Sequence, residues 1–418
     1  MKAQSRLLYL LLAWLSLSSL AQAQDGFYLK PGDRVVFYGD SITDQRLYTT
    51  FVETYIVTRF PQLNVSFVHS GWGGDRVTGG GGGKIDERLK RDVITYKPTV
   101  VTIMLGMNDG GYRAFDEKLF ENYSTGYQQI IQTLKSALPG LRLTLIQPSP
   151  YDDVTRAPLF DGGYNAVLLR YSQFIKELAQ KEKLQVADLN TSVVAAVTKA
   201  NTANATVAQR LIPDRVHPGA GGHLLMAAAL LKAWGAPAVV TSVEIDATSK
   251  RVVRAENTKA AELTAADSLS WTQTDSALPM PWDMNDAPLA LAVRSSSVVE
   301  DLNRQPLKVT GLAAARYTLK IDGEEIGSFT KEQLAEGINL ATLSTPMLRQ
   351  AAAVHALTLK HNSMHATRWR QVQVPWQSEM SPTLQKAMDA LDELELDLIK
   401  RQRTAAQPKP HRYELLPN

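Results

Sequence analysis

The segment RVVFYGDSITD, residues 34–44, joins a strand pattern to a helix start. Its apolar run ends at Gly39, and Ser41 follows with an acid, Asp40, directly before it. A serine placed there projects its oxygen over the edge of a sheet, where the free N–H groups of a following helix favour negative charge. SITD is also an ordinary helix-capping pattern. The stretch therefore predicts an α/β sheet that presents Ser41, with a plain helix cap as the alternative.

Further apolar runs rich in Val, Ile and Leu follow along the chain, and several lack a polar face. They are NVSFVHS (64–70), TVVTIMLG (99–106), RLTLIQP (142–148) and LQVADL (184–189). Helix-like segments alternate with them, at 46–60, 84–95, 117–137, 163–182 and 219–234. This alternation predicts a three-layer α/β/α sandwich around a parallel, flavodoxin-like sheet. In such a sheet, ligands bind at the carboxyl ends of the strands.

The pattern changes near residue 240, where polar and apolar residues begin to alternate. RYTLKIDGEEIGSFT (316–330) has the form of a hairpin with its turn at Asp322-Gly323. We interpret this region as a smaller strand-rich module with a helix near 346–361. A C-terminal helix is expected at 384–403, followed by a loose tail from Thr404. The predicted units are a signal peptide (1–23), an α/β domain (24–240), the strand-rich module (241–378) and the C-terminal helix with its tail (379–418).

The N-terminus reads MKAQSRLLYLLLAWLSLSSLAQAQ, with Lys2 and Arg6 before an apolar run at 7–20. That run is too short to span a membrane and ends at a small-residue cleavage site, which predicts a signal peptide and no stable membrane anchor. We therefore expect a secreted or periplasmic protein. Cleavage lowers the formal charge from +3 to +1, which gives no basis for binding nucleic acid. The 418 residues contain no cysteine, so disulfides and thiolate metal sites are excluded.

A serine nucleophile needs a base, a group that orients the base, and hydrogen-bond donors for the oxyanion. Of seven histidines, only His217 has an acid three residues before it, Asp214 in PDRVHPG (213–219). On a bend, Asp214 can accept a hydrogen bond from Nδ1 of His217 and leave Nε2 facing Ser41. A surface turn is the alternative interpretation of this pattern.

Two loops offer candidate donors for the oxyanion. Glycines in HSGWGGDR (69–76) let the backbone approach a ligand closely, and MLGMNDGG (104–111) places the side-chain amide of Asn108 after the third strand. Each loop alone is typical of an ordinary turn. Because both follow predicted strands, and His217 lies just before the last helix of the domain, we expect these groups to meet in one crevice.

Four blocks together carry a family resemblance. They are GDS (39–41), the glycines after the second strand, GMND (106–109) and DRVH (214–217). In this order they resemble the SGNH, or GDSL-type, hydrolases over roughly residues 31–235. His69 stands where that family often has an asparagine, which leaves Gly71 and Gly73 as alternatives to Gly74 in the second block.

The resemblance implies a serine ester hydrolase. Ser41 would be the nucleophile, His217 the base and Asp214 the acid that orients it. The implied oxyanion hole consists of the backbone N–H of Ser41, the N–H of Gly74 and the side-chain amide of Asn108. The reaction would pass through an acyl-enzyme and needs no cofactor or metal.

The predicted substrate is a small-molecule or polysaccharide ester with a short acyl group, acetyl in particular. Trp72 and Asp40 lie beside the site and are predicted to contact substrate, since an aromatic face suits a sugar ring. Three alternatives stay open: a lipase or lysophospholipase-like enzyme, acyl transfer to a sugar, and a non-catalytic carbohydrate-binding surface protein. The oligomeric state is not indicated.

Two further motifs do not fit the chemistry they suggest. TGGGGGK (78–84) lacks the first glycine and the final Ser or Thr of a phosphate-binding loop, so we expect a flexible loop beside the crevice. HNSMH (361–365) has the spacing of a zinc motif, but Asn362 replaces its glutamate and no third ligand is evident. No metal site is predicted.

Overall fold

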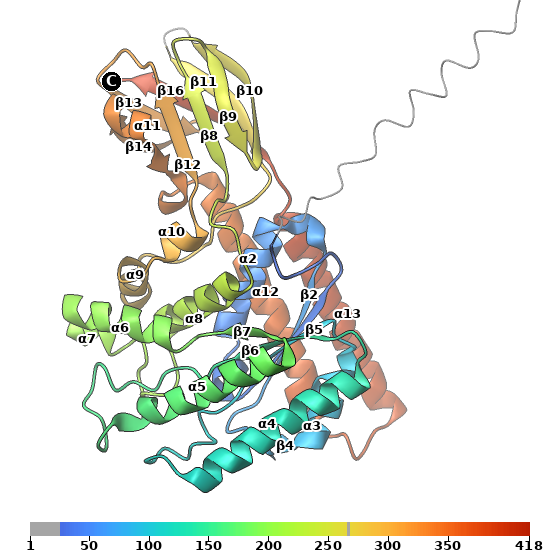
Figure 1. The fold of residues 1–418 in the computed structure, drawn as a ribbon. Coiled ribbons are helices and arrows are strands. Elements are labelled where there is room, and N and C mark those ends of the chain that lie inside the picture. The colour runs from blue at the N-terminus through green and yellow to red at the C-terminus, as the bar shows by residue number, and fades with distance from the viewer. Residues whose placement is uncertain (1–25, 266–267) are drawn as a thin grey trace, which may run out of the picture.

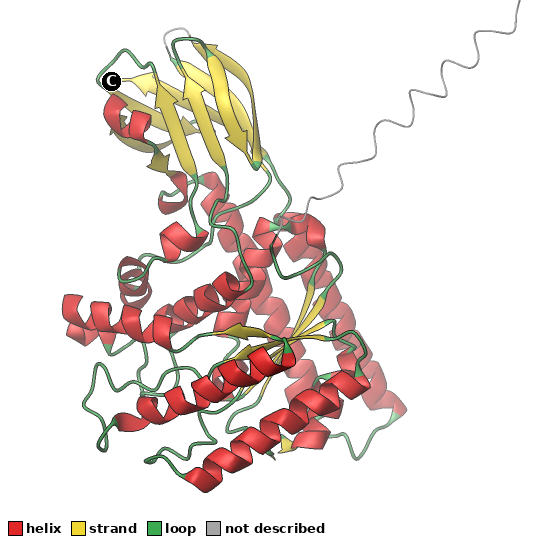
Figure 2. Cartoon of the chain, in the orientation of Figure 1, coloured by secondary structure: helices red, strands yellow, loops and turns green. Residues whose placement is uncertain are grey.

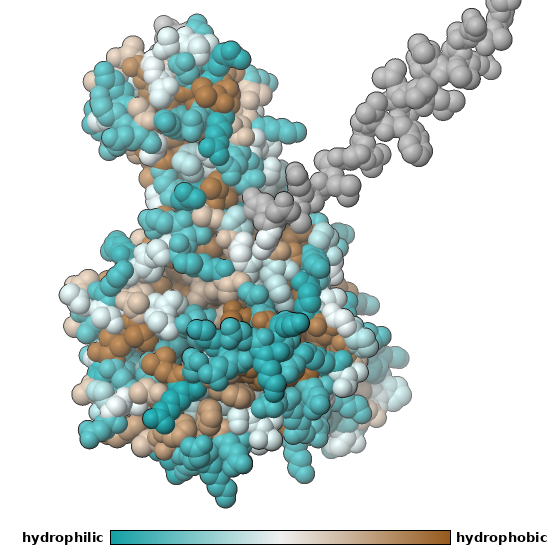
Figure 3. All heavy atoms as spheres, in the orientation of Figure 1, coloured by the Kyte–Doolittle hydropathy of each residue, from teal (hydrophilic) through white to brown (hydrophobic). Residues whose placement is uncertain are grey.

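The computed structural model of the chain describes residues 26–265 and 268–418, so the predicted signal peptide lies outside the described residues. These residues form two lobes, a larger α/β lobe and a smaller one rich in strands (Figure 1; Figure 2). In the space-filling view, the face toward the reader is mostly hydrophilic, with small hydrophobic groups between (Figure 3). Within the described ranges, every helix is too short or too polar to cross a membrane.

In the described part of the chain, a five-stranded sheet forms the centre of the larger lobe, with the order β2-β1-β5-β6-β7. The strands are β1 (Arg34–Gly39), β2 (Ser66–Gly71), β5 (Val100–Met104), β6 (Arg142–Ile146) and β7 (Gln185–Ala187). Every neighbouring pair is parallel. The apolar runs of the central strands are fully buried, as expected where helices cover both faces. The predicted flavodoxin-like sheet is confirmed.

Helices cover both sides of this sheet. On one side α2 (Leu47–Arg59) packs against α8 (Ala220–Ala233), and on the other lie α4 (Glu117–Ala137) and α5 (Gly163–Glu182) (Figure 1). These helices and α3 (Ile85–Asp92) match the predicted ranges closely. Helix α6 (Thr191–Ala203) and the short α7 (Ala205–Ala208) are not predicted from the sequence, because their alanine-rich segments have a weak polar face.

Two sheets build the described part of the smaller lobe, with the core between them. The four-stranded sheet contains β8 (Ser242–Asp246), β9 (Arg251–Glu256), β12 (Pro306–Thr310) and β15 (Ile338–Asn339). The five-stranded sheet contains β10 (Thr258–Ala265), β11 (Leu269–Asp275), β13 (Arg316–Ile321), β14 (Glu324–Thr330) and β16 (Pro410–Pro417). The predicted hairpin is β13–β14, and both turn residues, Asp322 and Gly323, have positive φ. Short helices α9 (Ala287–Arg294), α10 (Val298–Leu302) and α11 (Lys331–Glu336) complete the region.

The C-terminal tail is ordered, so the prediction of a loose tail from Thr404 is wrong. Residues 410–417 form β16, which pairs with β11 and β13 in the middle of the five-stranded sheet. Tyr413 and Leu415 are fully buried there and give the strand its two-residue period. Pro408 and Pro410 precede the pairing or open the strand, where they interrupt few ladder hydrogen bonds.

Helices α12 (Pro346–Ala366) and α13 (Pro382–Ala405) confirm the two helices predicted near the C-terminus. They pack on each other, and α12 also packs against α2 and β2 of the larger lobe (Figure 1). Between them, residues Thr367–Gln373 wind as a π-helix. Helices α12 and α13 therefore form an additional layer on the α/β lobe, beside strand β2.

Candidate active site

Ser41 is the first residue of the short helix α1 (Ser41–Asp44), which starts directly after β1. Asp40 caps this helix, since its Oδ1 accepts a hydrogen bond from the Ile42 N–H at 3.1 Å. Position 39 has no room for a side chain, because a Cβ atom there would lie 2.7 Å from the carbonyl oxygen of Met104 in β5. The GDS sequence thus places the serine tightly against the carboxyl edge of the sheet. As the first N–H of a helix, the Ser41 amide has no acceptor within that helix.

Asp40 is buried, with 1% of its surface exposed. Burial raises the pKa of its carboxyl group to about 7, although the hydrogen bond from Ile42 works against this rise. The structure does not support the predicted contact of Asp40 with substrate, because the carboxyl group is buried and caps α1.

His217 lies between Ser41 and Asp214. Its Nε2 is 2.9 Å from Ser41 Oγ, and its Nδ1 is 2.7 Å from Asp214 Oδ2. The other carboxylate oxygen accepts the backbone N–H groups of Val216 and His217 at 3.0 and 2.7 Å. Partial burial works to raise the pKa of Asp214, but these hydrogen bonds outweigh it and lower the pKa. The acid is thus a carboxylate that holds the imidazole with Nε2 toward the serine.

The loop that follows β6 fixes the Asp214–His217 turn. Arg215 has a φ of 72°, and its carbonyl oxygen accepts the Asp152 N–H at 2.9 Å. The Arg215 guanidinium donates back to the Asp152 carbonyl at 3.1 Å. These reciprocal bonds tie the turn to the carboxyl edge of the sheet, where Ser41 also lies.

Asn108 lies in the loop after β5, and two contacts set the orientation of its side-chain amide. Its Oδ1 accepts the Tyr112 hydroxyl at 2.8 Å, and its Nδ2 donates to the Asp75 carbonyl at 3.0 Å. An amide nitrogen carries two protons, so one N–H remains available. Tyr112 is 41% exposed and has a φ of 55°, a conformation that non-glycine residues adopt infrequently.

The turn after β2 supplies the glycines. Gly71 lies so close to α1 that a Cβ atom would be 2.1 Å from the Asp44 nitrogen. The Gly73 N–H donates to Asp44 Oδ2 at 3.2 Å, whereas the Gly74 N–H forms no hydrogen bond with any described residue. A φ of 78° also makes glycine the favoured residue at position 74. Among the three glycines, this geometry favours Gly74 as an oxyanion donor.

Trp72 packs within the protein. The Arg370 guanidinium lies 3.5 Å from the centroid of its ring, and the Trp369 ring meets it edge-on at 5.6 Å. A Cβ atom at Gly82 would lie 2.5 Å from the ring, so the β3–β4 hairpin (Gly79–Gly80 and Gly83–Lys84) packs closely against it. The predicted stacking of Trp72 on a sugar is therefore not supported, and the segment expected to be a flexible loop contains this hairpin.

Three residues that shape the site are not predicted from the sequence: Tyr112, Arg88 and Arg370. Arg88, in α3, is fully buried and donates to Asp75 Oδ2 at 2.7 Å and to the Ser70 carbonyl at 2.9 Å. It thereby holds the residues on both sides of the glycine turn, residues 71–74. Tyr112 could have been considered from its position four residues after Asn108, but no motif marks either arginine.

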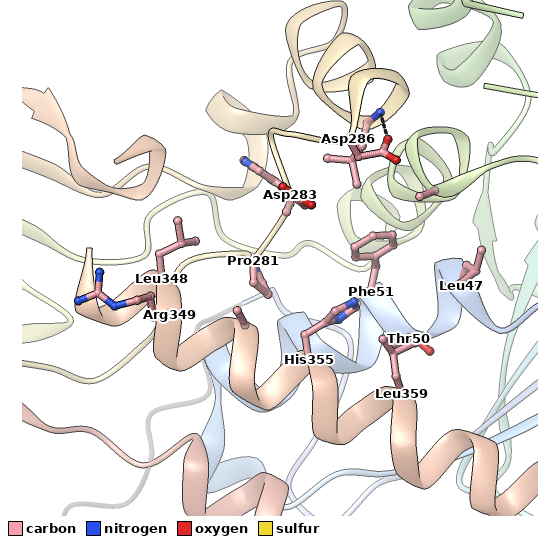
Figure 4. A pocket seen from close by; sticks show the side chains of 14 residues that line it. Leu47, Thr50, Phe51, Pro281, Asp283, Asp286, Leu348, Arg349, His355 and Leu359 are labelled. Atoms are coloured by element: carbon pink, nitrogen blue, oxygen red, sulfur yellow. Dashed lines mark hydrogen bonds between the residues drawn. The ribbon is translucent and has the colours of Figure 1, made fainter. Parts of the chain in front are cut away.

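An apolar pocket of about 530 Å³ lies elsewhere, between α2, the segment 281–289 and α12 (Figure 4). Phe51, His355 and Leu359 line it, and Asp283 and Asp286 lie on the opposite wall. None of its lining residues belongs to the hydrogen-bonded chain around Ser41. Within the described ranges, no group of three or more His, Cys, Asp or Glu residues could hold a metal ion.

Residues 37–225 match the GDSL-like lipase/acylhydrolase family. An acetylxylan esterase of Geobacillus stearothermophilus is 24% identical over 226 residues, which cover 49% of this chain and 94% of that esterase. The solved structure of a gut microbial diltiazem-metabolizing enzyme aligns with a TM-score of 0.83 and 27% identity, over 93% of this chain and 98% of the other. That similarity includes the strand-rich lobe and the C-terminal helices. Residues 37–225 therefore form a domain of the GDSL-like lipase/acylhydrolase type, similar to that of an acetylxylan esterase.

Proposed function

We propose that the protein is an exported serine esterase that hydrolyses short acyl esters, acetyl esters in particular, on carbohydrate. The observation that carries the proposal is the pair of hydrogen bonds that link Asp214, His217 and Ser41, at 2.7 and 2.9 Å. A serine is a weak nucleophile unless a base stands within hydrogen-bond reach, and here the base is itself held by a carboxylate.

In the proposed reaction, His217 Nε2 accepts the proton of Ser41 as Oγ attacks the acyl carbonyl carbon. The negative charge that forms on the carbonyl oxygen is stabilised by the N–H groups of Ser41 and Gly74 and by the free N–H of Asn108. The intermediate then collapses, and His217 protonates the departing alcohol. A water molecule, deprotonated by His217, hydrolyses the acyl-enzyme and restores Ser41.

The proposed substrate class rests on the similarity to an acetylxylan esterase and on the predicted signal peptide, which would place the enzyme outside the cytoplasm. Since Trp72 packs under Arg370, another aromatic group would have to contact the alcohol part of the ester. Tyr112 is exposed beside Asn108, and its ring lies 6.3 Å from that of Tyr151. Tyr151 is buried, so we assign the exposed ring of Tyr112 alone to the alcohol part of the substrate.

The test compares acetate release from acetylated xylo-oligosaccharides and from 4-nitrophenyl acetate with hydrolysis of 4-nitrophenyl palmitate. We expect kcat/KM to be at least 100-fold higher for acetate than for palmitate, on the order of 3 kcal/mol of discrimination. A preference for palmitate would indicate a lipase instead. Equal acetate release by wild type and Ser41→Ala would support a non-catalytic binding protein, and acylated sugar formed with an added acceptor would reveal acyl transfer.

Asn108→Ala is expected to lower kcat for 4-nitrophenyl acetate by about 10²–10³-fold, the usual loss when one oxyanion donor is removed. Tyr112→Phe should cost less, because the amide stays in place and loses only the hydroxyl that orients it at 2.8 Å. Steady-state kinetics of both variants provide the measurement. A turnover of Asn108→Ala equal to wild type would remove Asn108 from the oxyanion hole.

A further inference from the structure

The glycine turn beside Ser41 is held by an arginine from the far end of the chain. Arg370 lies in the π-helical segment Thr367–Gln373, and its Nη1 is 3.0 Å from Asp44 Oδ1 and 3.4 Å from the Gly71 carbonyl oxygen. Its guanidinium also covers the Trp72 ring at 3.5 Å. One side chain therefore contacts both α1 and the turn that follows β2.

Asp44 extends this contact to the next residue of the turn. It is the last residue of α1, and its second oxygen, Oδ2, accepts the Gly73 N–H at 3.2 Å. Arg370 thus contacts Gly71 and Trp72 directly, and it is linked to Gly73 through Asp44. The next residue is Gly74, whose N–H forms no hydrogen bond with any described residue.

Neighbouring side chains anchor the π-helical segment, so Arg370 is presented at a defined position. Trp369 is 2% exposed, and its indole N–H donates to Asp92 Oδ1 at 2.6 Å. Arg368 pairs with Asp392 of α13 at 2.9 Å. π-helical turns occur frequently at functional sites, and this one brings three successive side chains to three different partners.

The ion pair between Arg370 and Asp44 is not expected to contribute much to stability. Both side chains are more than a quarter exposed, 27% and 29%, and pairs of this kind add little to the free energy of unfolding. Position is a different matter, because a small displacement of a catalytic donor can cost large factors in rate. An arginine suits this task, since its planar fork can bond two oxygens while it stacks on an aromatic face.

We propose that Arg370 is a positioning residue of the esterase site. Through Asp44 and Trp72 it holds residues 71–73 so that the Gly74 N–H points at the oxyanion. This inference rests on the proposed function, and it makes the C-terminal helical segment part of the catalytic apparatus of the full chain.

The test uses the full chain, 4-nitrophenyl acetate, and the variants Arg370→Ala, Arg370→Lys and Asp44→Asn. Arg370→Ala should lower kcat by about 10- to 100-fold, with KM within about threefold of wild type, because donor geometry acts on the transition state. Arg370→Lys should recover part of the loss, since it keeps the charge but not the fork. The double variant Arg370→Ala/Asp44→Asn should be no slower than the slower single variant, as expected for two members of one contact.

Arg254→Ala is the matched control, because Arg254 is an exposed arginine of β9 whose ion pair, with Glu256 at 2.7 Å, involves neither α1 nor the turn after β2. It should keep the turnover of wild type. If Arg370→Ala retains wild-type kcat, or changes only KM, the positioning role is wrong, and Ser41→Ala in the same assay shows whether the esterase assignment stands regardless. Should Arg370→Ala fail to fold by circular dichroism, Asp44→Asn and Arg370→Lys decide the question, and wild-type kcat in both would refute the inference.

Discussion

Replacing Ser41 by alanine is expected to lower kcat for an activated acetate ester by about 10⁶-fold, the scale seen when a serine hydrolase loses its nucleophile. The hydroxyl lies 2.9 Å from His217 Nε2, and alanine leaves no atom there to form the acyl-enzyme. Steady-state hydrolysis, with a fluorophosphonate that labels an activated serine as a second readout, provides the measurement. The wild type should gain the mass of the phosphonyl group, and Ser41→Ala should not.

Ser124→Ala is a suitable control for this experiment. Ser124 lies on an exposed stretch of α4 and donates only to the Glu121 carbonyl of its own helix at 3.0 Å. Its loss should leave both turnover and labelling unchanged. If Ser41→Ala hydrolysed the ester at the wild-type rate, the assignment of Ser41 as nucleophile would be wrong, whatever the other variants show.

The same assay separates the base from the acid that orients it. His217→Ala should be nearly as slow as Ser41→Ala, and combining the two should add little, because they act as one unit. Asp214→Ala should have a smaller effect and lower kcat by about 10⁴-fold relative to wild type. The side chain of Asp214 is 56% exposed, so water can take the place of the carboxylate beside Nδ1. A larger loss for Asp214→Ala than for His217→Ala would contradict this division of roles.

The convergence of Ser41 and His217 could be predicted from the sequence, although 176 residues separate them. Ser41 lies between a predicted strand and the helix that follows it, and His217 lies just before the last helix of the domain. In a parallel sheet, such connecting segments meet at one edge. Asn108 and the glycines after β2 follow the same rule. Local patterns of this kind are sufficient because the topology of the sheet, rather than any one contact, brings these residues together.

The contributions of the C-terminal third could not be predicted in the same way. Arg370, Trp369 and β16 act through contacts with residues about 90 to 330 positions earlier, and nothing in their own segments names the partner. For Trp72 the sequence predicts a contact that the structure does not support. Its position beside the site suggests sugar binding, but the Arg370 guanidinium covers one face of the ring. Packing between segments distant in sequence decides these cases.

A buried charge cluster also joins the C-terminal helices to the larger lobe. His361 in α12, from the HNSMH motif, pairs through Nε2 with Glu53 in α2, and its Nδ1 lies 3.7 Å from Glu395 in α13. His69 in β2 and Gln402 in α13 also bond to Glu53, at 3.1 and 2.9 Å. The motif that suggests a metal site is thus a set of ion pairs that links three helices and a strand.

The charge state of this cluster follows from the competition between burial and the carboxylates. Burial works to lower the pKa of His361, but Glu53 and Glu395 outweigh it and raise the pKa to about 9. Burial would raise the pKa of both acids, yet His361 with its neighbours holds that of Glu53 well below its usual range and lowers that of Glu395 to about 2. In His69, burial prevails and lowers the pKa, so His361 is the cation that neutralises Glu53.

Replacing His361 by leucine is therefore expected to lower the free energy of unfolding by about 3–5 kcal/mol at pH 6, because it leaves buried carboxylates without their cation. The pKa of His361 in the folded protein lies above the value of 6.5 for a free side chain. Its contribution is then complete below pH 6.5 and is lost as the pH rises toward 9. Urea unfolding of wild type and His361→Leu at pH 6, 7.5 and 9 should show a difference that narrows with pH.

His355 provides the matched control on the same helix. It stacks on Phe51 at 5.2 Å and bonds to Thr54 Oγ1 at 2.9 Å, and burial lowers its pKa to about 4, so it is neutral throughout this range. His355→Leu should cost only about 1 kcal/mol, the value of one neutral hydrogen bond, and that cost should not change between pH 6 and 9. A deficit of His361→Leu that stays equally constant over this range would mean that His361 carries no charge in the folded protein. The link between the C-terminal helices and α2 would then be a hydrogen bond and not an ion pair.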